Sequence, residues 1–307
     1  MSESRGGCRV RIADVAVRAA GGLVIGDKPR TPRLTTAPPP RQDNSPPPTA
    51  PPAPRLIDDF VMGMRFFTRL PAGDAPHEAP SLTRMAPALP FASLAAGFLP
   101  ALLMMGLCWM SAPSFVAATV GVALMIVLTG AMPEDALADA ADGLFGGATV
   151  ERRLEIMKDS RHGTYGVVAI ALYVLLRVTV LGSVAAINPL AAGALMLAAA
   201  IVARSGALWL SLQLPAAREG GAAASAGRVT RTAFWIGAAF AAGLLFVLAG
   251  PFAGLLAVIL VLVAASAVAS AWVWACRRLV GGQTGDLIGA LHALIEVSAL
   301  IVLVMFA

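Results

Sequence analysis

The sequence predicts an all-α, polytopic integral membrane helical bundle with about six or seven transmembrane helices and a disordered, proline-rich amino-terminal tail. The chain is 58% hydrophobic and only 13% charged, whereas an ordinary soluble domain is about 25% charged. Apolar stretches of the length that crosses a bilayer, about 20 residues, recur along most of the chain. The first 54 residues lack such stretches and are rich in proline and arginine.

The tail is expected to span residues 1–54, ahead of a membrane domain at 55–307. Half of all the prolines lie between Pro29 and Pro54, and so polar and proline-rich a segment cannot bury a core. It has arginines but no long apolar run before a cleavage site, which argues against a secretory signal.

An amphipathic helix is predicted over "LIDDFVMGMRFFTRLP", which begins at Leu56. Leu56, Phe60, Met64 and Phe67 recur at steps of three and four, and Pro71 ends the pattern. Such a helix lies on the membrane surface or packs against protein.

Seven apolar segments are candidate spans, and Pro251 leaves open whether the fifth and sixth are one long segment. They are 89–110, 114–132, 166–187, 190–214, 233–250, 252–275 and 287–306. The basic residues beyond the tail fall in alternate loops, and the remaining short turns carry no charge. The positive-inside rule therefore places every charged loop in the cytoplasm. This topology also explains the net charge of +5, so the lipid bilayer is an expected partner and nucleic acid is not.

The stretch "EDALADAADG" places four carboxylates directly after an apolar segment. On a helix at about 100° per residue, Asp135, Asp139 and Asp142 share one stripe and Glu134 falls about 100° away. Like charges at this spacing repel, whereas a bridging divalent cation such as Mg²⁺ would reverse the cost. The alternative is a solvated helix face, but the neighbours are alanines rather than the lysines of such a face. We therefore expect a metal site at the three aspartates.

A second motif, "ERRLEIMKDSRHGTYG", follows a glycine-rich turn. Lys158, Asp159, Ser160 and Arg161 supply a cation, a carboxylate, a hydroxyl and a guanidinium. Cationic groups beside Mg²⁺ suit a diphosphate substrate. Contact with lipid headgroups is the alternative for the basic residues.

A third motif, "GGQTGDLIGALHALIE", brings Thr284 and Asp286 to the mouth of the last span on the same side. Arg177, Arg204 and Glu296 lie within spans, where charged groups should face the bundle interior. Arg204 and Glu296 either pair with each other or reach toward the polar site. His162 and His292 lack metal-ligand spacing and are interpreted as structural.

Chemistry alone thus points to Mg²⁺-assisted transfer of a phosphate-linked group at the cytoplasmic membrane face. The stretches "PEDALADAADGLFGG", "RRLEIMKDSRHGTYGV" and "GGQTGDLIGA" together resemble the cobalamin synthase family, adenosylcobinamide-GDP ribazoletransferase. "FFTRLP" and "AAREG" are similar to further family landmarks, so the resemblance covers about residues 56–306. The chain departs from the pattern at Pro133, where the family has His, and at Ala136, where it has Gly.

The resemblance implies a multi-pass bacterial inner-membrane enzyme that joins α-ribazole, or its 5′-phosphate, to adenosylcobinamide-GDP. Adenosylcobalamin, or its phosphate, forms and GMP leaves, with Mg²⁺ as cofactor. Asp135, Asp139 and Asp142 would hold Mg²⁺, while Lys158 and Arg161 neutralise the diphosphate and Asp159 orients or deprotonates the attacking hydroxyl. Ser160, Thr284, Asp286 and Arg204 are expected to contact substrate. A homo-oligomer is compatible with this picture.

Two rival functions fit the sequence less well. A CDP-alcohol phosphotransferase also sets aspartates beside a nucleotide diphosphate, but Gly146 and Gly147 stand where its motif needs Ala and Arg. A small-solute transporter would use charged residues within the spans, yet would place its polar site at mid-membrane rather than in cytoplasmic loops.

Overall fold

The computed structural model describes residues 56–72, 80–159, 161–218 and 226–307. The proposed tail at 1–54 and Ser160 lie outside these ranges, so the expectations for them stay predictions. Within the described ranges the regular structure is helical, and one isolated parallel bridge joins Ala216 and Gln283. The prediction of an all-α membrane bundle is confirmed.

Four unbroken helices are long and apolar enough to cross a membrane: α3 (Leu89–Trp109), α7 (Thr164–Ile187), α8 (Pro189–Gln213) and α11 (Gly285–Val304). The fifth such helix, α10 (Arg231–Leu279), has 49 residues. A straight helix of that length would measure about 74 Å, more than twice the hydrocarbon thickness of about 30 Å.

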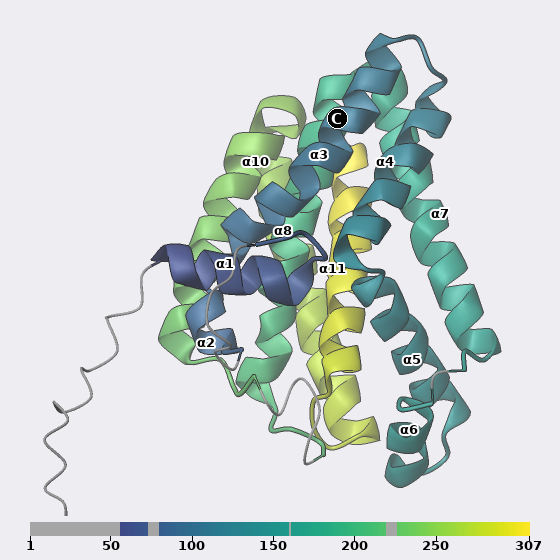
Figure 1. Ribbon diagram of the computed structural model, residues 1–307, viewed down its shortest axis with the longest axis vertical. Helices are drawn as coiled ribbons and strands as arrows, with labels where there is room; N and C mark the ends of the chain where they lie inside the picture. Colours follow the sequence, from purple (N-terminus) through teal and green to yellow (C-terminus); the bar gives the residue numbers. More distant parts are fainter. Residues whose placement is uncertain (1–55, 73–79, 160, 219–225) are drawn as a thin grey trace, which may run out of the picture. The chain divides into compact units, whose positions relative to one another are not determined.

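α10 consists of two consecutive helices. Its backbone leaves the helical region at Gly254 (φ 82°, ψ 168°), close to Pro251, where the sequence leaves open whether there are one or two spans. Residues of 234–242 and of 262–270 line one groove against α8, so the two halves run antiparallel (Figure 1).

α4 (Ser114–Thr129) and α5 (Met132–Gly146) form one broken span with a bend of 83°. Gly130 and Ala131 at the bend have φ of 64° and 56°, the left-handed region that costs a non-glycine residue strain. The Arg69 amide donates a hydrogen bond to Leu128 O at 2.7 Å and holds the bend from outside. When each half of α10 and this bent pair count as one span, the described residues contain seven candidate spans, within the six or seven that the sequence predicts.

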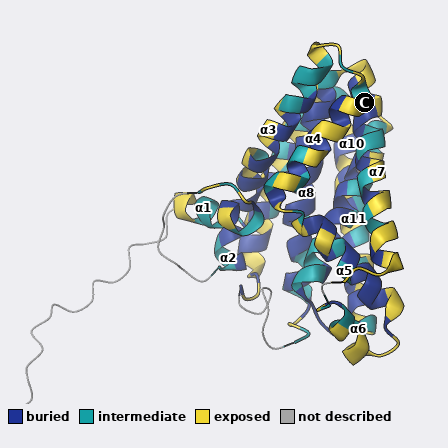
Figure 2. Ribbon diagram, turned by 45° about the vertical axis from the view of Figure 1, so that its right-hand side comes forward, coloured by how far each residue is buried: buried dark blue, intermediate teal, exposed yellow. Residues whose placement is uncertain are grey.

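α8 is the central helix and is buried along nearly its whole length (Figure 2). It contacts α3, α7, α10 and α11. Its sequence is rich in alanine and glycine, and small side chains let neighbouring membrane helices approach closely. The helices around α8 are therefore held at short range, which fixes the side chains they direct inward.

Among the described residues, three short helices lie outside the candidate spans: α1 (Leu56–Phe67), α2 (Leu82–Met85) and α6 (Val150–Ile156). α1 lies across the bundle (Figure 1) and contacts α2 and α3. Gly63 and Met64 are buried, whereas Leu56 and Ile57 stay exposed. The helix therefore packs on protein with one face, and its predicted contact with the membrane surface stays a prediction.

Candidate active site

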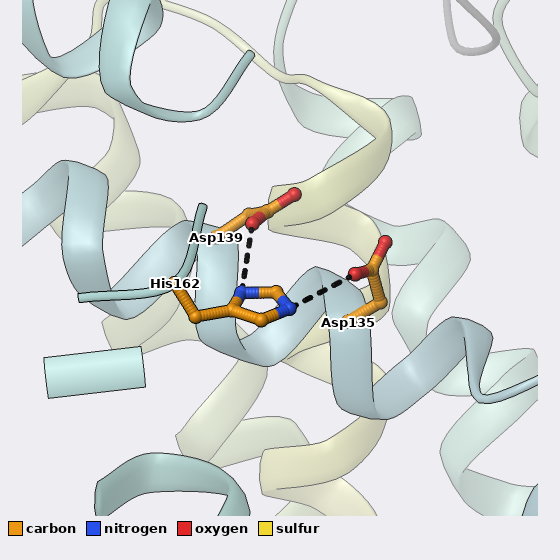
Figure 3. Close-up of side chains that lie close together, drawn as sticks. All are labelled: Asp135, Asp139 and His162. Carbon is orange, nitrogen blue, oxygen red and sulfur yellow. Dashed lines mark ion pairs between the residues drawn. The ribbon is translucent and has the colours of Figure 1, made fainter. Parts of the chain in front are cut away.

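Two acidic residues of α5 and a histidine from the loop before α7 form a compact cluster (Figure 3). His162 Nε2 lies 3.6 Å from Asp135 Oδ1, and its Nδ1 lies 3.6 Å from Asp139 Oδ1. One ligand atom from each of the three residues lies within 4.8 Å of the others. Two carboxylates one helical turn apart repel each other, so a divalent cation at this place would relieve a cost that nothing in the helix offsets.

The sequence predicts a structural role for His162, because a histidine far from Asp135 in the chain has no metal-ligand spacing, whereas the structure places it beside Asp135 and Asp139. The structure brings it back to α5 through α6 and the following loop. The one local hint in the sequence is Gly163, the next residue, which precedes the first turn of α7 and so indicates a loop at His162.

Asp142 is not part of this cluster, although it shares the predicted helical stripe. Its Oδ2 accepts a hydrogen bond from Gly163 N at 2.6 Å, and its Oδ1 accepts one from Gly166 N at 2.9 Å. These amides belong to the first turn of α7, where a carboxylate satisfies unpaired N–H groups and interacts favourably with the helix dipole. Asp142 therefore anchors the loop that carries His162, instead of joining the candidate metal ligands.

We predict that Gly166→Ala destabilises the protein. An added Cβ would overlap Asp142 Oδ2 and lie 3.0 Å from Ala138 O. Overpacking of this kind costs about 1–3 kcal/mol, and the displaced carboxylate would release its cap on α7 as well. Thermal unfolding in detergent measures the effect, with Gly106→Ala as the control because a Cβ there meets nothing within 4 Å. Equal melting temperatures for the two variants would show that Asp142 does not hold α7.

The motif after α6 faces solvent. Arg161 donates to Asp159 through Nε at 3.0 Å and Nη2 at 2.7 Å, and its side chain is 87% exposed. These hydrogen bonds lower the pKa of Asp159 to about 2, so the carboxylate is ionised at neutral pH and is a weak proton acceptor. Lys158 is also exposed. The structure thus pairs Asp159 with Arg161 at the protein surface.

The start of α11 is tied to the end of α8 by backbone hydrogen bonds, Gln283 N to Pro215 O at 2.8 Å and Ala217 N to Gln283 O at 2.9 Å. Thr284 Oγ1 accepts from Leu287 N at 3.2 Å and caps α11. Thr284, predicted to contact substrate, is therefore used as a helix cap. Asp286 lies 3.5 Å from Arg218 Nη2.

A pocket of about 200 Å³ opens between α1, α5, α8 and α11. Asp135 lies on its wall, so the pocket and the acidic cluster share this residue. The other polar or charged side chains of the lining are Arg204, Asp286 and His292, and the remaining lining is apolar or glycine: Phe66, Phe67, Leu82, Met132, Pro133, Ala136, Ala207, Leu208, Ala226, Gly285, Ile288 and Gly289. Pro133 and Ala136, where the chain departs from the family pattern, are both part of this wall.

Arg204 faces this pocket. Its Nη1 donates a hydrogen bond to Ser93 Oγ at 3.4 Å, and its guanidinium lies 5.5 Å from the centre of the Phe67 ring. Of the two alternatives drawn from the sequence, pairing with Glu296 is wrong and reaching toward the polar site is the one observed.

Glu296 belongs to a separate buried network that joins α5, α7 and α11. Arg177 Nη1 donates to Glu134 Oε1 at 2.9 Å, and its Nε lies 3.2 Å from Glu296 Oε1. The Tyr173 hydroxyl donates to Glu296, and His292 Nε2 lies 3.3 Å from the same carboxylate. Because Glu134 precedes Asp135, this network fixes how α5 presents its acidic face.

Comparison with known proteins gives a consistent result. The sequence model of the family described as cobalamin-5-phosphate synthase matches residues 59–304. A relative from Azorhizobium caulinodans, named adenosylcobinamide-GDP ribazoletransferase, is 38% identical over 82% of this chain and 97% of its own length. Relatives of the same name from Sinorhizobium sp and Brucella ovis are 41% and 35% identical, over 79% and 81% of this chain and 94% and 97% of their own.

No solved structure matches the chain. The family match covers the acidic cluster, the pocket and the candidate spans of the described residues. The chain therefore belongs to the cobalamin-5-phosphate synthase family and is a transferase of cobalamin synthesis.

Proposed function

We propose that this transferase joins α-ribazole, or its 5′-phosphate, to adenosylcobinamide-GDP and releases GMP, with Mg²⁺ as cofactor, at the cytoplasmic face of the inner membrane. The name shared by the relatives supplies the two substrates. The observation that carries the proposal is the cluster of Asp135, Asp139 and His162 beside a pocket large enough for part of a nucleotide or nucleoside.

The donor set fits a divalent cation. Mg²⁺ is bound through one or two carboxylates together with substrate phosphates, and Asp135 and Asp139 offer two carboxylates on one helix face. His162 supplies a third, nitrogen donor of a kind that transition metals prefer. When bound, Mg²⁺ would neutralise charge on the diphosphate and polarise the phosphoryl oxygens. Asp142 is left out of the ligand set, because both of its oxygens hold amides of α7.

The reaction exchanges one phosphoester partner for another. A ribose hydroxyl oxygen of α-ribazole bonds to the phosphorus that bears cobinamide, the bond from that phosphorus to the bridging oxygen breaks, and GMP departs with that oxygen. The hydroxyl proton passes to solvent. Lys158 and Arg161 share the exposed loop with His162, so they are placed to bind the charged diphosphate. Asp159 orients Arg161 and, with a pKa of about 2, is a poor base.

The topology supports a cytoplasmic site. With seven passes, the N-termini of α7 and α11 and the C-terminus of α8 lie at the same end of the bundle as the cluster. The basic residues of the connections gather there, at Arg152, Arg153, Lys158, Arg161, Arg218, Arg228, Arg231, Arg277 and Arg278. Lysine and arginine are enriched in cytoplasmic loops.

Sealed membrane vesicles test activity and orientation together. The protein is produced in a host without its own enzyme, and inside-out and right-side-out vesicles receive adenosylcobinamide-GDP, α-ribazole and Mg²⁺. We expect cobamide from the inside-out vesicles only, since both substrates are charged or bulky and do not cross the bilayer. Cobamide from neither preparation, with an active relative as control, would refute the activity, and cobamide from right-side-out vesicles alone would refute the orientation.

A further inference from the structure

We infer that the pocket between α1, α5, α8 and α11 receives the aromatic base of the acceptor nucleoside, α-ribazole, and that its apolar wall selects this base. The inference rests on the proposed function and adds to it the substrate part that each region of the site binds. It follows from the size of the pocket, from the chemistry of its wall and from its position beside the acidic cluster.

Size excludes most of the larger substrate. The pocket measures about 200 Å³, below the roughly 300–1,000 Å³ of pockets that enclose drug-sized ligands. The corrin macrocycle of adenosylcobinamide-GDP, with its amide side chains, is much larger than such ligands. A single bicyclic base is of the right size. Two bicyclic groups therefore compete for the pocket, the guanine of the GDP moiety and the dimethylated benzimidazole of α-ribazole.

The wall favours the benzimidazole. Apolar side chains from five helices, among them Phe67, Leu208 and Ile288, make up most of the lining. Guanine has hydrogen-bond donors and acceptors on several edges, and those that face the apolar side chains would be buried without partners at a cost in free energy. The benzimidazole base has two methyl groups, a fused aromatic ring and one free ring nitrogen, so it loses little by burial.

Three of the four polar or charged side chains of the wall have a contact within the protein. Arg204 contacts Ser93, His292 contacts Glu296, and Asp286 contacts Arg218. Arg204 makes one hydrogen bond of 3.4 Å, and Asp286 Oδ2 accepts none. The preference for the benzimidazole therefore rests on the apolar side chains, which make up most of the wall.

The position of the pocket beside the cluster also sets the orientation of the bound nucleoside, with its ribose toward the cluster. Asp135 lines the pocket and lies 3.6 Å from His162 in the cluster. A base seated against Phe67 and Leu208 would leave its ribose at the Asp135 side of the pocket. The attacking hydroxyl would then face the diphosphate held at the cluster. The larger substrate approaches from the cytoplasmic side of the cluster, where Lys158 and Arg161 are exposed.

A variant that fills the pocket tests this assignment. Gly285 lines the pocket, and a Cβ there meets nothing within 4 Å, so Gly285→Leu places new atoms in open space. Gly243→Leu is the matched control, because Gly243 also has open space but lies on α10 away from the pocket. KM is measured for each substrate with the other saturating, in purified protein with Mg²⁺.

We expect Gly285→Leu to raise the KM for α-ribazole at least about tenfold, as one or a few methylenes in a binding pocket do. The KM for adenosylcobinamide-GDP should stay within about twofold of wild type, because that substrate binds outside the pocket and its contacts with the protein do not change. Gly243→Leu should change neither value. A rise confined to adenosylcobinamide-GDP, or no rise for either substrate, would overturn the assignment.

Leu208→Ala provides a second variant if Gly285→Leu does not fold. It enlarges the pocket, removes apolar contact and should likewise raise the KM for α-ribazole alone. An unchanged KM would overturn the assignment just as well. Failure of wild-type protein to form cobamide refutes the proposed function instead, so the two failures are distinguishable.

Discussion

Replacing Asp139 with alanine is expected to reduce turnover at least about 100-fold, because even groups that only support a metal ligand are worth about 10- to 100-fold. Asp139 is half-buried and faces His162 at 3.6 Å. Removing its carboxylate leaves Asp135 as the only acid of the cluster, too few for a cation that must also hold a diphosphate. The rate of cobamide formation by purified protein in detergent measures the loss.

Glu155→Ala is the control for this experiment. Glu155 is an exposed carboxylate of α6 that pairs with Arg152 on the protein surface, so its removal should leave the rate unchanged. Size-exclusion chromatography should show both variants as folded protein. An Asp139→Ala variant that turns over at the wild-type rate would return the acidic stretch to the alternative of a solvated helix face.

Arg177→Met is expected to have the largest effect on stability. Arg177 is almost fully buried and is the cation between Glu134 and Glu296. Removing one partner of a buried ion pair leaves charge without compensation and costs about 3–5 kcal/mol, a large share of a typical folding free energy of about 5–15 kcal/mol. The fall in thermal unfolding temperature, measured in the same detergent, reports this cost.

An exposed pair of the same chemistry is the control. Arg152 contacts Glu155 at 2.7 Å on the surface, and exposed pairs contribute only about 0–1 kcal/mol. Arg152→Met should therefore unfold close to the wild-type temperature. If Arg177→Met did so as well, the buried network would not hold α5 against α7 and α11.

The fold could be read largely from the sequence, because membrane spans depend on local hydropathy and length alone. The apolar segments follow from those two properties, whereas Pro251 leaves open whether the fifth and sixth are one span or two. The break falls instead at Gly254, since only glycine readily adopts φ 82°. The bend of α4 into α5 was not foreseen, because Ala131 has a left-handed conformation that its residue type does not favour.

The site was predicted in part. The helical stripe of Asp135 and Asp139 follows from a local period of 3.6 residues, and these two residues do lie together. The sequence predicts Asp142 as a metal ligand and His162 as structural, whereas the structure places His162 in the cluster and Asp142 at the start of α7. Tertiary contacts decide both positions. The loop before α7 brings His162 to α5, and the first turn of α7 occupies Asp142 with two amide hydrogen bonds. A helical wheel shows neither contact.

The buried network shows the same limit. Arg177, Arg204 and Glu296 were expected to face the interior, but hydropathy does not say which charges pair. Arg177 pairs with the carboxylates of both Glu134 and Glu296. Arg204 instead lines the pocket and lies over the Phe67 ring. Because the charges of the network are paired with one another, they do not require a transport pathway through the bundle.

The central claim is that this chain exchanges GMP for α-ribazole on adenosylcobinamide-GDP with the help of a divalent cation. The most direct test measures GMP and cobamide in one reaction of the purified protein, with Mg²⁺ and after chelation by EDTA. The account predicts equal amounts of the two products with Mg²⁺, and neither product after chelation until Mg²⁺ is restored. Release of GMP without cobamide, or undiminished turnover in EDTA, would contradict it.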